Sequence, residues 1–325
     1  MKVLFVGGTG IISSACARLA IDRGIELYLL NRGQSSREVP AGAHVLRANI
    51  YDWGSADAAL GDHTFDAVVN WVAFVPENVE SDLDLFRDRT GQYIFISSAS
   101  VYQTPPAHLP ITESTPLYNP FWEYSRNKIA CEERLMRACR EEGFPVTIVR
   151  PSHTYDERAI PLHGGYTAID RMRNGRKIIV HGDGSSLWVL THHRDFAKGF
   201  VGLLGHAGAI GHAVHITSDE LLTWDQIAHH LARAAGAAAD IVHVPSDVIA
   251  RHDPDWGASL LGDKTHSMIF DNTKIKRLVP GFEATIPFAR GAEEILSWYD
   301  GDASRRVVDQ GLNDHVDRIL AAVGA

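Results

Sequence analysis

Length, composition and charge restrict the class of protein. The chain has 325 residues, enough for one large domain or for a domain with an elaborated second lobe. Its hydrophobic content of 45% and charged content of 22% are typical of soluble globular proteins. The formal net charge of −9 argues against a general binder of nucleic acids or anionic membranes, because neutralising phosphates requires clustered Lys and Arg.

The cysteines and the first apolar run bear on the cellular compartment. Cys16, Cys131 and Cys139 are too few and too scattered for a disulfide framework or a zinc site, and they suit a reducing cytoplasm. The apolar run after Met1 is interrupted by glycines, so neither a signal peptide nor a membrane span is expected. These features predict a cytoplasmic protein.

The first 150 residues alternate short apolar runs with helical stretches, the pattern of a parallel sheet built from βαβ units. Gly24 and Gly143 lie where two of the helices should end. Five prolines between residues 104 and 120 predict a loop. Strands are expected at 2–6, 26–30, 44–46, 67–71, 93–97 and 146–149, and helices at 11–22, 57–60, 77–86 and 122–142.

After residue 150 the pattern becomes mixed, and glycines interrupt it often. Strands are expected at 177–180, 213–216 and 241–244, and helices at 196–204, 224–235, 273–278, 292–299 and 314–322. We interpret residues 151–325 mainly as a smaller C-terminal α/β lobe that binds a substrate, with the chain returning to the first domain in places. The histidines, including the adjacent pairs His192-His193 and His229-His230, have no spacing that requires a metal, and no metal is predicted.

A glycine-rich segment, Gly7-Gly8-Thr9-Gly10-Ile11-Ile12-Ser13, follows the first expected strand and opens the first expected helix. Gly7 and Gly10 would permit a tight turn and a close approach of the backbone to a pyrophosphate. The helix that begins near Ile11 and Ile12 would point its positive end at that anion. This context favours a Rossmann-type doubly wound parallel sheet, with residues 1–150 as an NAD(P)-binding domain, over an ordinary tight turn.

The end of the second strand bears on the choice of dinucleotide. An acidic residue there would bind the free 2′-hydroxyl of NAD, whereas an arginine suits the 2′-phosphate of NADP. The chain has Asn31-Arg32, with Arg37 as a second candidate, which favours NADP. NAD stays open because Asn31 could serve its ribose.

The most informative motif is Tyr124-Ser-Arg-Asn-Lys128, located 26 residues after Ser98. On a helix, residues four apart share one face. The ammonium of Lys128 is then expected to lower the pKa of the Tyr124 phenol, because a nearby positive charge favours the phenolate. Such a tyrosine can act as an acid/base, with Ser98 holding the substrate oxygen. The alternative is an ordinary amphipathic helix that carries a Tyr and a Lys.

Further motifs follow in order along most of the chain: Asn49-Ile50, Ser97-Ser98-Ala99-Ser100-Val101-Tyr102, Arg150-Pro151 and Asp195-Phe196-Ala197. With the two motifs above, they resemble the extended short-chain dehydrogenase/reductase family, in its NAD-dependent epimerase/dehydratase group. The resemblance implies catalytic roles for Ser98, Tyr124 and Lys128, and a homodimer. The full set of expected cofactor-binding residues is Gly7, Gly10, Ile11, Ile12, Asn31, Arg32, Asn49, Ile50, Trp71, Val72, Ala73, Tyr124, Lys128, Pro151 and His153.

The chain departs from the family pattern in three places. Ala99 and Ser100 follow Ser98 where sugar-nucleotide 4,6-dehydratases carry an acidic pair, so that elimination is not expected. Trp188 stands where many epimerases hold an arginine against the substrate diphosphate. His153 replaces an asparagine or a similar amide, and either a second proton shuttle or a simple hydrogen-bonding group would fit there.

These features predict an enzyme that exchanges hydride between NAD(P) and an alcohol or keto carbon of a sugar, a sugar nucleotide or a similar polyol. Whether the net reaction is epimerisation or oxidation is open. The substrate is expected to contact Phe74, Ser98, His153 and Trp188. The chain also resembles the branch that includes chloroplast stem-loop RNA-binding proteins, in Asn31-Arg32-Gly33, residues 175–178 and residues 216–224. The alternative is therefore an RNA-binding protein without redox turnover, which the negative charge disfavours.

Overall fold

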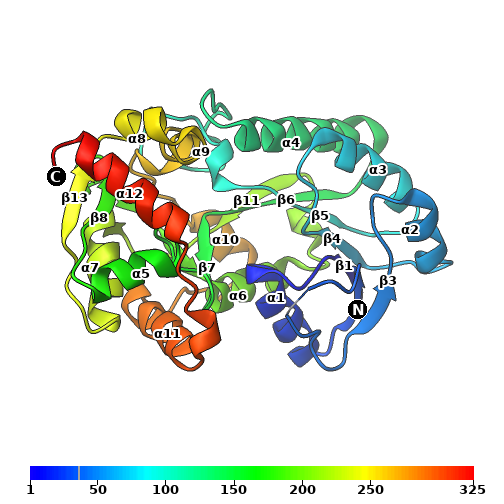
Figure 1. The fold of residues 1–325 in the computed structure, drawn as a ribbon. Helices are drawn as coiled ribbons and strands as arrows, with labels where there is room; N and C mark the ends of the chain where they lie inside the picture. Colours follow the sequence, from blue (N-terminus) through cyan, green and yellow to red (C-terminus); the bar gives the residue numbers. More distant parts are fainter. Residues whose placement is uncertain (36) are drawn as a thin grey trace.

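A seven-stranded parallel sheet forms the centre of the larger lobe in the computed structural model, which describes residues 1–35 and 37–325 (Figure 1). The strand order is β11-β6-β5-β4-β1-β2-β3, so the chain crosses over beside β1, as in a doubly wound sheet. The strands are β1 (Lys2–Val6), β2 (Glu26–Asn31), β3 (His44–Arg47), β4 (Ala67–Asn70), β5 (Tyr93–Ile96), β6 (Val146–Pro151) and β11 (His212–Ile216).

Helices cover both faces of this sheet, which explains why its inner strands are apolar without alternation. Alternate residues of β1 face opposite layers: Val3 and Phe5 pack towards one set of helices, and Leu4 and Val6 towards the other. The first set is α1 (Ile11–Asp22), α6 (His193–Leu203) and α10 (Thr273–Leu278). The second set is α2 (Trp53–Leu60), α3 (Pro76–Phe86) and α4 (Glu123–Glu142).

The six strands and four helices expected before residue 150 are all present, and residues 104–120 form a loop, as predicted. Among these elements the largest boundary difference is at α2, which begins at Trp53 rather than at residue 57. Asp52 caps this helix by accepting a hydrogen bond from Ser55 N at 3.2 Å. Gly143 ends α4 with a φ of 72°, a left-handed conformation that glycine adopts without strain.

The second lobe is smaller and contains three two-stranded sheets. These pair β7 (His153–Tyr155) with β10 (Leu190–His192), β8 (Ile178–His181) with β13 (Ile241–Val244), and β9 (Leu187–Trp188) with β12 (Leu222–Thr223). Its helices are α5 (Tyr166–Arg173), α7 (Trp224–Ala234), α8 (Ser246–His252), α9 (Pro254–Ser259), α11 (Phe288–Asp300) and α12 (Gln310–Ala322). Sequence reasoning did not predict α5, α8 or α9.

The chain returns to the first lobe after residue 150, since β11, α6 and α10 all belong to the layers of the large sheet. A division at residue 150 stays a prediction. Across residues 1–35 and 37–325, no helix combines the length and apolar character needed to cross a bilayer.

Candidate active site

The glycine turn between β1 and α1 leaves little room for side chains at its first two positions. Gly7 and Gly8 have φ angles of 96° and 95°, which other residues rarely adopt. A Cβ on Gly8 would lie 2.7 Å from Leu29 Cδ2, and one on Gly7 would lie 3.2 Å from Val72 Cγ1. The turn therefore presents bare backbone at the start of α1, the arrangement that binds a pyrophosphate.

Two adjoining cavities lie along this turn, with volumes of about 670 Å³ and 500 Å³. Both are lined by Gly7, Thr9, Val72 and Phe74, so they form one continuous cleft. Among the predicted cofactor residues, Asn31, Arg32, Asn49 and Ile50 line the larger cavity. Gly10, Ile11, Ile12, Trp71, Tyr124, Lys128 and Pro151 line the smaller one. The structure thus brings these predicted residues together along one cleft.

Two predicted cofactor residues lie elsewhere. Ala73 is buried, with 1% exposure, and reaches the site only through its carbonyl oxygen, which accepts from Lys128 Nζ at 2.7 Å. His153 lines two cavities beyond the cleft instead of the cleft itself. Phe74, expected to contact substrate, lines the cofactor cleft instead. The sequence located these residues near the carboxyl ends of expected strands, and therefore near the site. The direction in which each side chain points follows only from the tertiary structure.

The two arginines considered for the 2′-phosphate have different environments. Arg32 is exposed and lines the larger cavity. Arg37 lines it too, but its Nη1 lies 2.5 Å from Asp156 Oδ2, and the side chain of Asp156 is fully buried. Arg37 is therefore already paired. Arg47 also lines this cavity, although sequence reasoning did not single it out.

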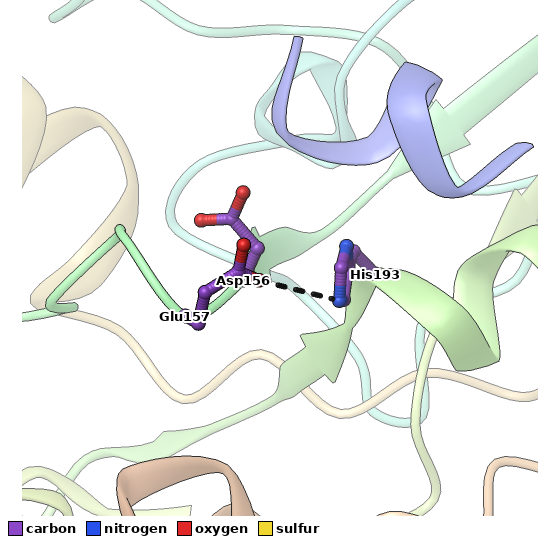
Figure 2. Close-up of side chains that lie close together, drawn as sticks. All are labelled: Asp156, Glu157 and His193. Atoms are coloured by element: carbon purple, nitrogen blue, oxygen red, sulfur yellow. Dashed lines mark ion pairs between the residues drawn. The ribbon is translucent and has the colours of Figure 1, made fainter. Parts of the chain in front are cut away.

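Asp156 also lies close to Glu157 and His193 (Figure 2). Their potential ligand atoms are within 4.8 Å of one another, close enough to hold a metal ion. However, the guanidinium of Arg37 already neutralises Asp156, and His193 Nε2 lies 3.8 Å from Glu157 Oε2. Burial lowers the pKa of His193 to about 4, so its imidazole is neutral. Within this cluster, the charge of Asp156 is thus already balanced by Arg37.

Lys128 is almost completely buried, with 2% exposure. Its Nζ donates to the carbonyl oxygens of Ala73 and Ile96, at 2.7 and 2.8 Å. Burial lowers the pKa of Lys128 to about 8. An ammonium has three donors, and the two carbonyls use two of them. Because Lys128 also lines the cleft, the third donor is available for a ligand hydroxyl.

Tyr124 and Ser98 lie at the junction of the cofactor cleft and a third cavity, and line both. Burial raises the pKa of Tyr124, the Ser98 side chain lowers it, and the charge of Asp263 raises it further. The predicted lowering by Lys128 is therefore wrong for the protein alone, because burial dominates. Ser98 Oγ lies 2.9 Å from Ser100 Oγ, which accepts from Ser125 Oγ at 2.7 Å. This chain of hydroxyls holds Ser98 in place beside Tyr124.

The third cavity, of about 280 Å³, lies on the side of Tyr124 away from the glycine turn, and we call it the substrate cavity. Two predicted substrate residues, His153 and Trp188, line it together with Ser98. Trp188 Nε1 donates to His153 Nδ1 at 3.1 Å, so the imidazole carries its proton on Nε2. Burial and the charge of Lys264 lower the pKa of His153 to about 3. His153 therefore suits a hydrogen-bonding role and not a proton shuttle at neutral pH.

Sequence reasoning missed Asp263 and Lys264, which also line the substrate cavity. They belong to η3 (Leu260–Lys264), a π-helical segment, a type of turn that often occurs at functional sites. Lys264 Nζ lies 5.4 Å from the centroid of the Trp122 ring, a cation–π contact. In the sequence, only the adjacency of an acidic and a basic residue could have pointed to this part of the site. Such pairs are common on protein surfaces, so they do not identify a functional position.

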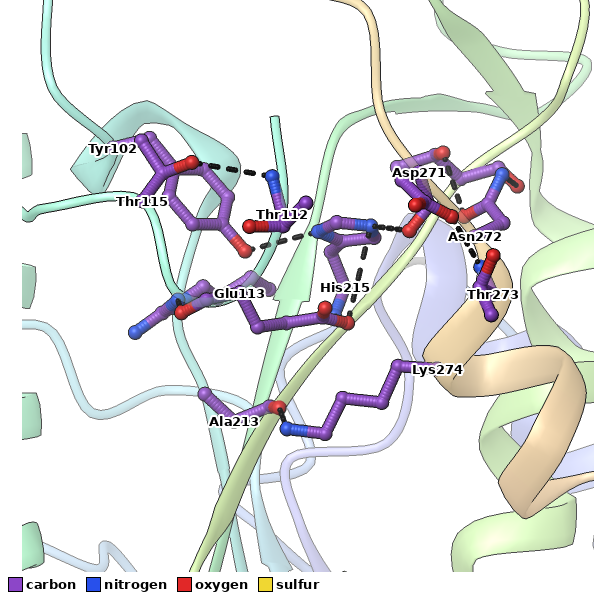
Figure 3. Close-up of polar contacts among 12 residues, drawn as sticks. Tyr102, Thr112, Glu113, Thr115, Ala213, His215, Asp271, Asn272, Thr273 and Lys274 are labelled. Atoms are coloured by element: carbon purple, nitrogen blue, oxygen red, sulfur yellow. Dashed lines mark hydrogen bonds and ion pairs between the residues drawn. The ribbon is translucent and has the colours of Figure 1, made fainter. Parts of the chain in front are cut away.

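A buried polar network ties the segment after Ser98 to β11 and to the segment between η3 and α10 (Figure 3). Tyr102, just after Ser98, donates its hydroxyl proton to His215 Nδ1 at 2.9 Å, and His215 Nε2 donates to the carbonyl of Asp271 at 2.7 Å. Ile111 adds two backbone hydrogen bonds to the same segment, to Ile269 O and from Asp271 N. The strand-like segment after η3 is therefore held against the loop that follows Ser98.

The comparisons with known proteins agree with this geometry. The model of the NAD-dependent epimerase/dehydratase family matches residues 3–217, about two thirds of the chain. The chain therefore belongs to the NAD-dependent epimerase/dehydratase family, as its motifs suggested.

Relatives within the family differ in function. The chain is 28% identical over 262 residues to a chloroplast stem-loop binding protein of 41 kDa from Arabidopsis thaliana, covering 74% of this chain and 65% of that protein. It is 29% identical over 168 residues to a UDP-glucose 4-epimerase from Lactobacillus helveticus, covering 46% and 51%. These two alignments thus span less than two thirds of each relative.

Solved structures confirm the fold. An epimerase from Methanothermobacter thermautotrophicus superposes with a TM-score of 0.77 at 17% identity, covering 94% of both chains. A UDP-glucose 4-epimerase from Bifidobacterium longum, in complex with NAD+ and UDP, gives a TM-score of 0.74 at 18% identity, covering 94% of this chain and all of that one.

Proposed function

We propose that the protein is an NAD(P)-dependent oxidoreductase or epimerase that acts on an alcohol or keto carbon of a sugar, a sugar nucleotide or a similar polyol. One observation carries this proposal: Ser98 and Tyr124 line both the cofactor cleft and the substrate cavity. A substrate carbon held there would lie beside Tyr124 and face the cofactor at once. Bound in the cleft, the dinucleotide would accept a hydride and give it back.

Each catalytic side chain has a distinct role in this proposal. Tyr124 accepts the proton of the substrate hydroxyl during oxidation and returns it during reduction. Ser98 hydrogen-bonds to the same oxygen and is positioned by Ser100. Lys128, whose ammonium is held by two backbone carbonyls, binds ribose hydroxyls with its remaining donor.

Substrate retention decides between the two net reactions. A ketone that stays bound and takes the hydride back on its other face is epimerised, whereas a ketone that leaves is the product of a dehydrogenase. We propose NADP as the preferred dinucleotide, because Arg32 is exposed in the cleft beside Asn31. By family likeness, we also propose a cytoplasmic homodimer.

RNA binding without turnover is the less favoured alternative. The similarity to the chloroplast stem-loop binding protein supports it. Against it, the chain carries a formal net charge of −9 and keeps Ser98, Tyr124 and Lys128 along one cleft. A protein that only bound RNA would have no chemical need for this set.

The test is to denature the purified protein, identify any released dinucleotide, and titrate NAD(H) and NADP(H) onto stripped protein. UDP-glucose and dTDP-glucose are then incubated with the loaded protein, and reduced nicotinamide and epimeric products are followed by absorbance and NMR. Tightly retained NAD with epimer formation would support an epimerase. Weak, exchangeable binding with NADP preferred would support a reductase. Retained RNA and no dinucleotide binding would overturn the proposal.

A further inference from the structure

Asp263 reaches the substrate cavity from a segment that is fixed on several sides. The preceding residue, Gly262, has no side chain, and a Cβ there would lie 2.7 Å from Trp122 Cβ. The carbonyl of Gly262 accepts from Asn119 Nδ2 at 2.6 Å. This close contact places η3 against the start of α4, the helix that carries Tyr124. Asp263 and Tyr124 therefore line the substrate cavity from two segments that pack against each other.

The carboxylate of Asp263 is poorly satisfied by the protein. Its side chain is only 15% exposed, and its cationic neighbour, Lys264 Nζ, lies 3.8 Å from Oδ2, beyond hydrogen-bond distance. Within residues 1–35 and 37–325, no hydrogen bond to this carboxylate is present. A largely buried carboxylate without a hydrogen bond is costly unless a ligand supplies one. Burial raises the pKa of Asp263 to about 6, which suits proton transfer near neutral pH.

We propose that Asp263 is a second acid/base group of this site, which removes and returns the proton on the substrate carbon next to the carbon oxidised beside Tyr124. This inference rests on the proposed function, because it needs the ketone that oxidation forms. It adds carbon-proton exchange to hydride exchange.

The step balances as an enolisation. Once the substrate carbon is a ketone, the neighbouring C–H bond is acidic. The Asp263 carboxylate takes that proton, the C–H electron pair becomes the C=C bond of an enol, and the carbonyl oxygen takes a proton from Tyr124. In reverse, protonated Asp263 delivers a proton to the same carbon while Tyr124 recovers its own. No oxidant beyond the nicotinamide dinucleotide that formed the ketone is required.

The other groups of the cavity are less suited to this step. Ala99 and Ser100 replace the acidic pair that would follow Ser98 in the dehydratases. His153 is neutral, and Trp188 already donates to its free nitrogen. Tyr124 and Ser98 serve the reacting oxygen. The second lobe thus supplies the carboxylate that the first lobe lacks.

The test compares wild-type protein with Asp263→Asn and with Asp247→Asn, a control whose side chain is 70% exposed on α8. Each protein is loaded with NAD+ or, in a parallel set, with NADP+, and incubated with UDP-glucose or dTDP-glucose in D2O. Deuterium in the recovered sugar is located by NMR, and reduced nicotinamide is followed by absorbance. A second readout needs no substrate: carbon-13 NMR of proteins labelled at Asp carboxyls, in which the resonance missing from Asp263→Asn reports its titration.

We expect deuterium at the neighbouring carbon in wild-type and Asp247→Asn proteins. In Asp263→Asn we expect exchange to fall at least about 100-fold while hydride transfer persists. Hydride transfer without deuterium in wild-type protein, or unchanged exchange in Asp263→Asn, would overturn the inference and leave the proposed function intact. If neither UDP-glucose nor dTDP-glucose is oxidised, the proposed function fails for these two substrates. The carboxyl titration then decides: a midpoint near pH 6 supports a poised Asp263, and one near that of an exposed Asp, about 3.9, overturns it.

Discussion

Lys128 lies one helical turn from Tyr124 on α4, yet backbone carbonyls, and not the phenol, hold its ammonium. Lys128 Nζ is 5.8 Å from the centroid of the Tyr124 ring, and it donates to Ala73 O and Ile96 O at 2.7 and 2.8 Å. Both side chains line the cofactor cleft, but only Tyr124 also lines the substrate cavity.

This separation predicts that Tyr124→Phe removes turnover and spares dinucleotide binding. Loss of an acid/base group lowers turnover by about 10²–10⁴-fold. Calorimetry with NAD(H) and NADP(H) should give affinities within about threefold of wild type, since the remaining cleft residues are unchanged. Tyr118→Phe, at an exposed loop position, is the control and should retain full activity. An active Tyr124→Phe protein would rule out the tyrosine mechanism.

Substitutions of Arg32 and Arg37, which both line the larger cavity of the cofactor cleft, should differ in their effect on dinucleotide binding. Arg32→Ala should weaken NADP(H) binding at least about tenfold more than NAD(H) binding, because a charge-assisted bond to the 2′-phosphate is lost. Arg37→Ala should show less discrimination, because this guanidinium pairs with buried Asp156. Dissociation constants of both variants for both dinucleotides provide the measurement. Equal losses for the two dinucleotides in Arg32→Ala would refute the NADP preference.

The glycine turn can be tested with a matched pair of substitutions. Gly8→Ala combines a φ of 95° with a Cβ only 2.7 Å from Leu29, so it should cost at least about 2 kcal/mol and abolish dinucleotide binding. Gly24→Ala, with a φ of 76° and no atom within 4 Å of the added Cβ, should cost about 1 kcal/mol and leave binding intact. Urea denaturation and dinucleotide titration measure the two effects. Similar losses of stability and of dinucleotide affinity in Gly8→Ala and Gly24→Ala would contradict the steric argument.

Asp263 should make stability depend on pH. Its pKa is raised from 3.8 to about 6, so between these values the folded state binds more protons than the unfolded state. The free energy of unfolding therefore falls as pH rises through this window, and the loss persists above it. Asp263→Asn should lack this loss and be about 1–3 kcal/mol more stable than wild type at pH near 7. Denaturant titrations of both proteins at several pH values test this. A constant difference across the window would show that Asp263 titrates normally.

Local patterns in the sequence were sufficient for the elements that build the cleft. A strand, a glycine turn and a helix start predict backbone that can approach a phosphate, and the structure has β1, Gly7, Gly8 and α1 in that order. The spacing of Tyr124 and Lys128 similarly predicted a shared helix face, and α4 spans both. These inferences succeeded because helix and strand periodicity is a property of neighbouring residues.

Only the tertiary structure decided which way single side chains face and which distant segments meet them. Phe74 faces the cofactor cleft, Arg37 is paired with Asp156, and Asp263 joins Tyr124 from 139 positions along the chain. The pKa of Tyr124 depends in the same way on burial by several segments. Sequence spacing carries no information on such contacts, because they arise when separate elements pack together and exclude water between them.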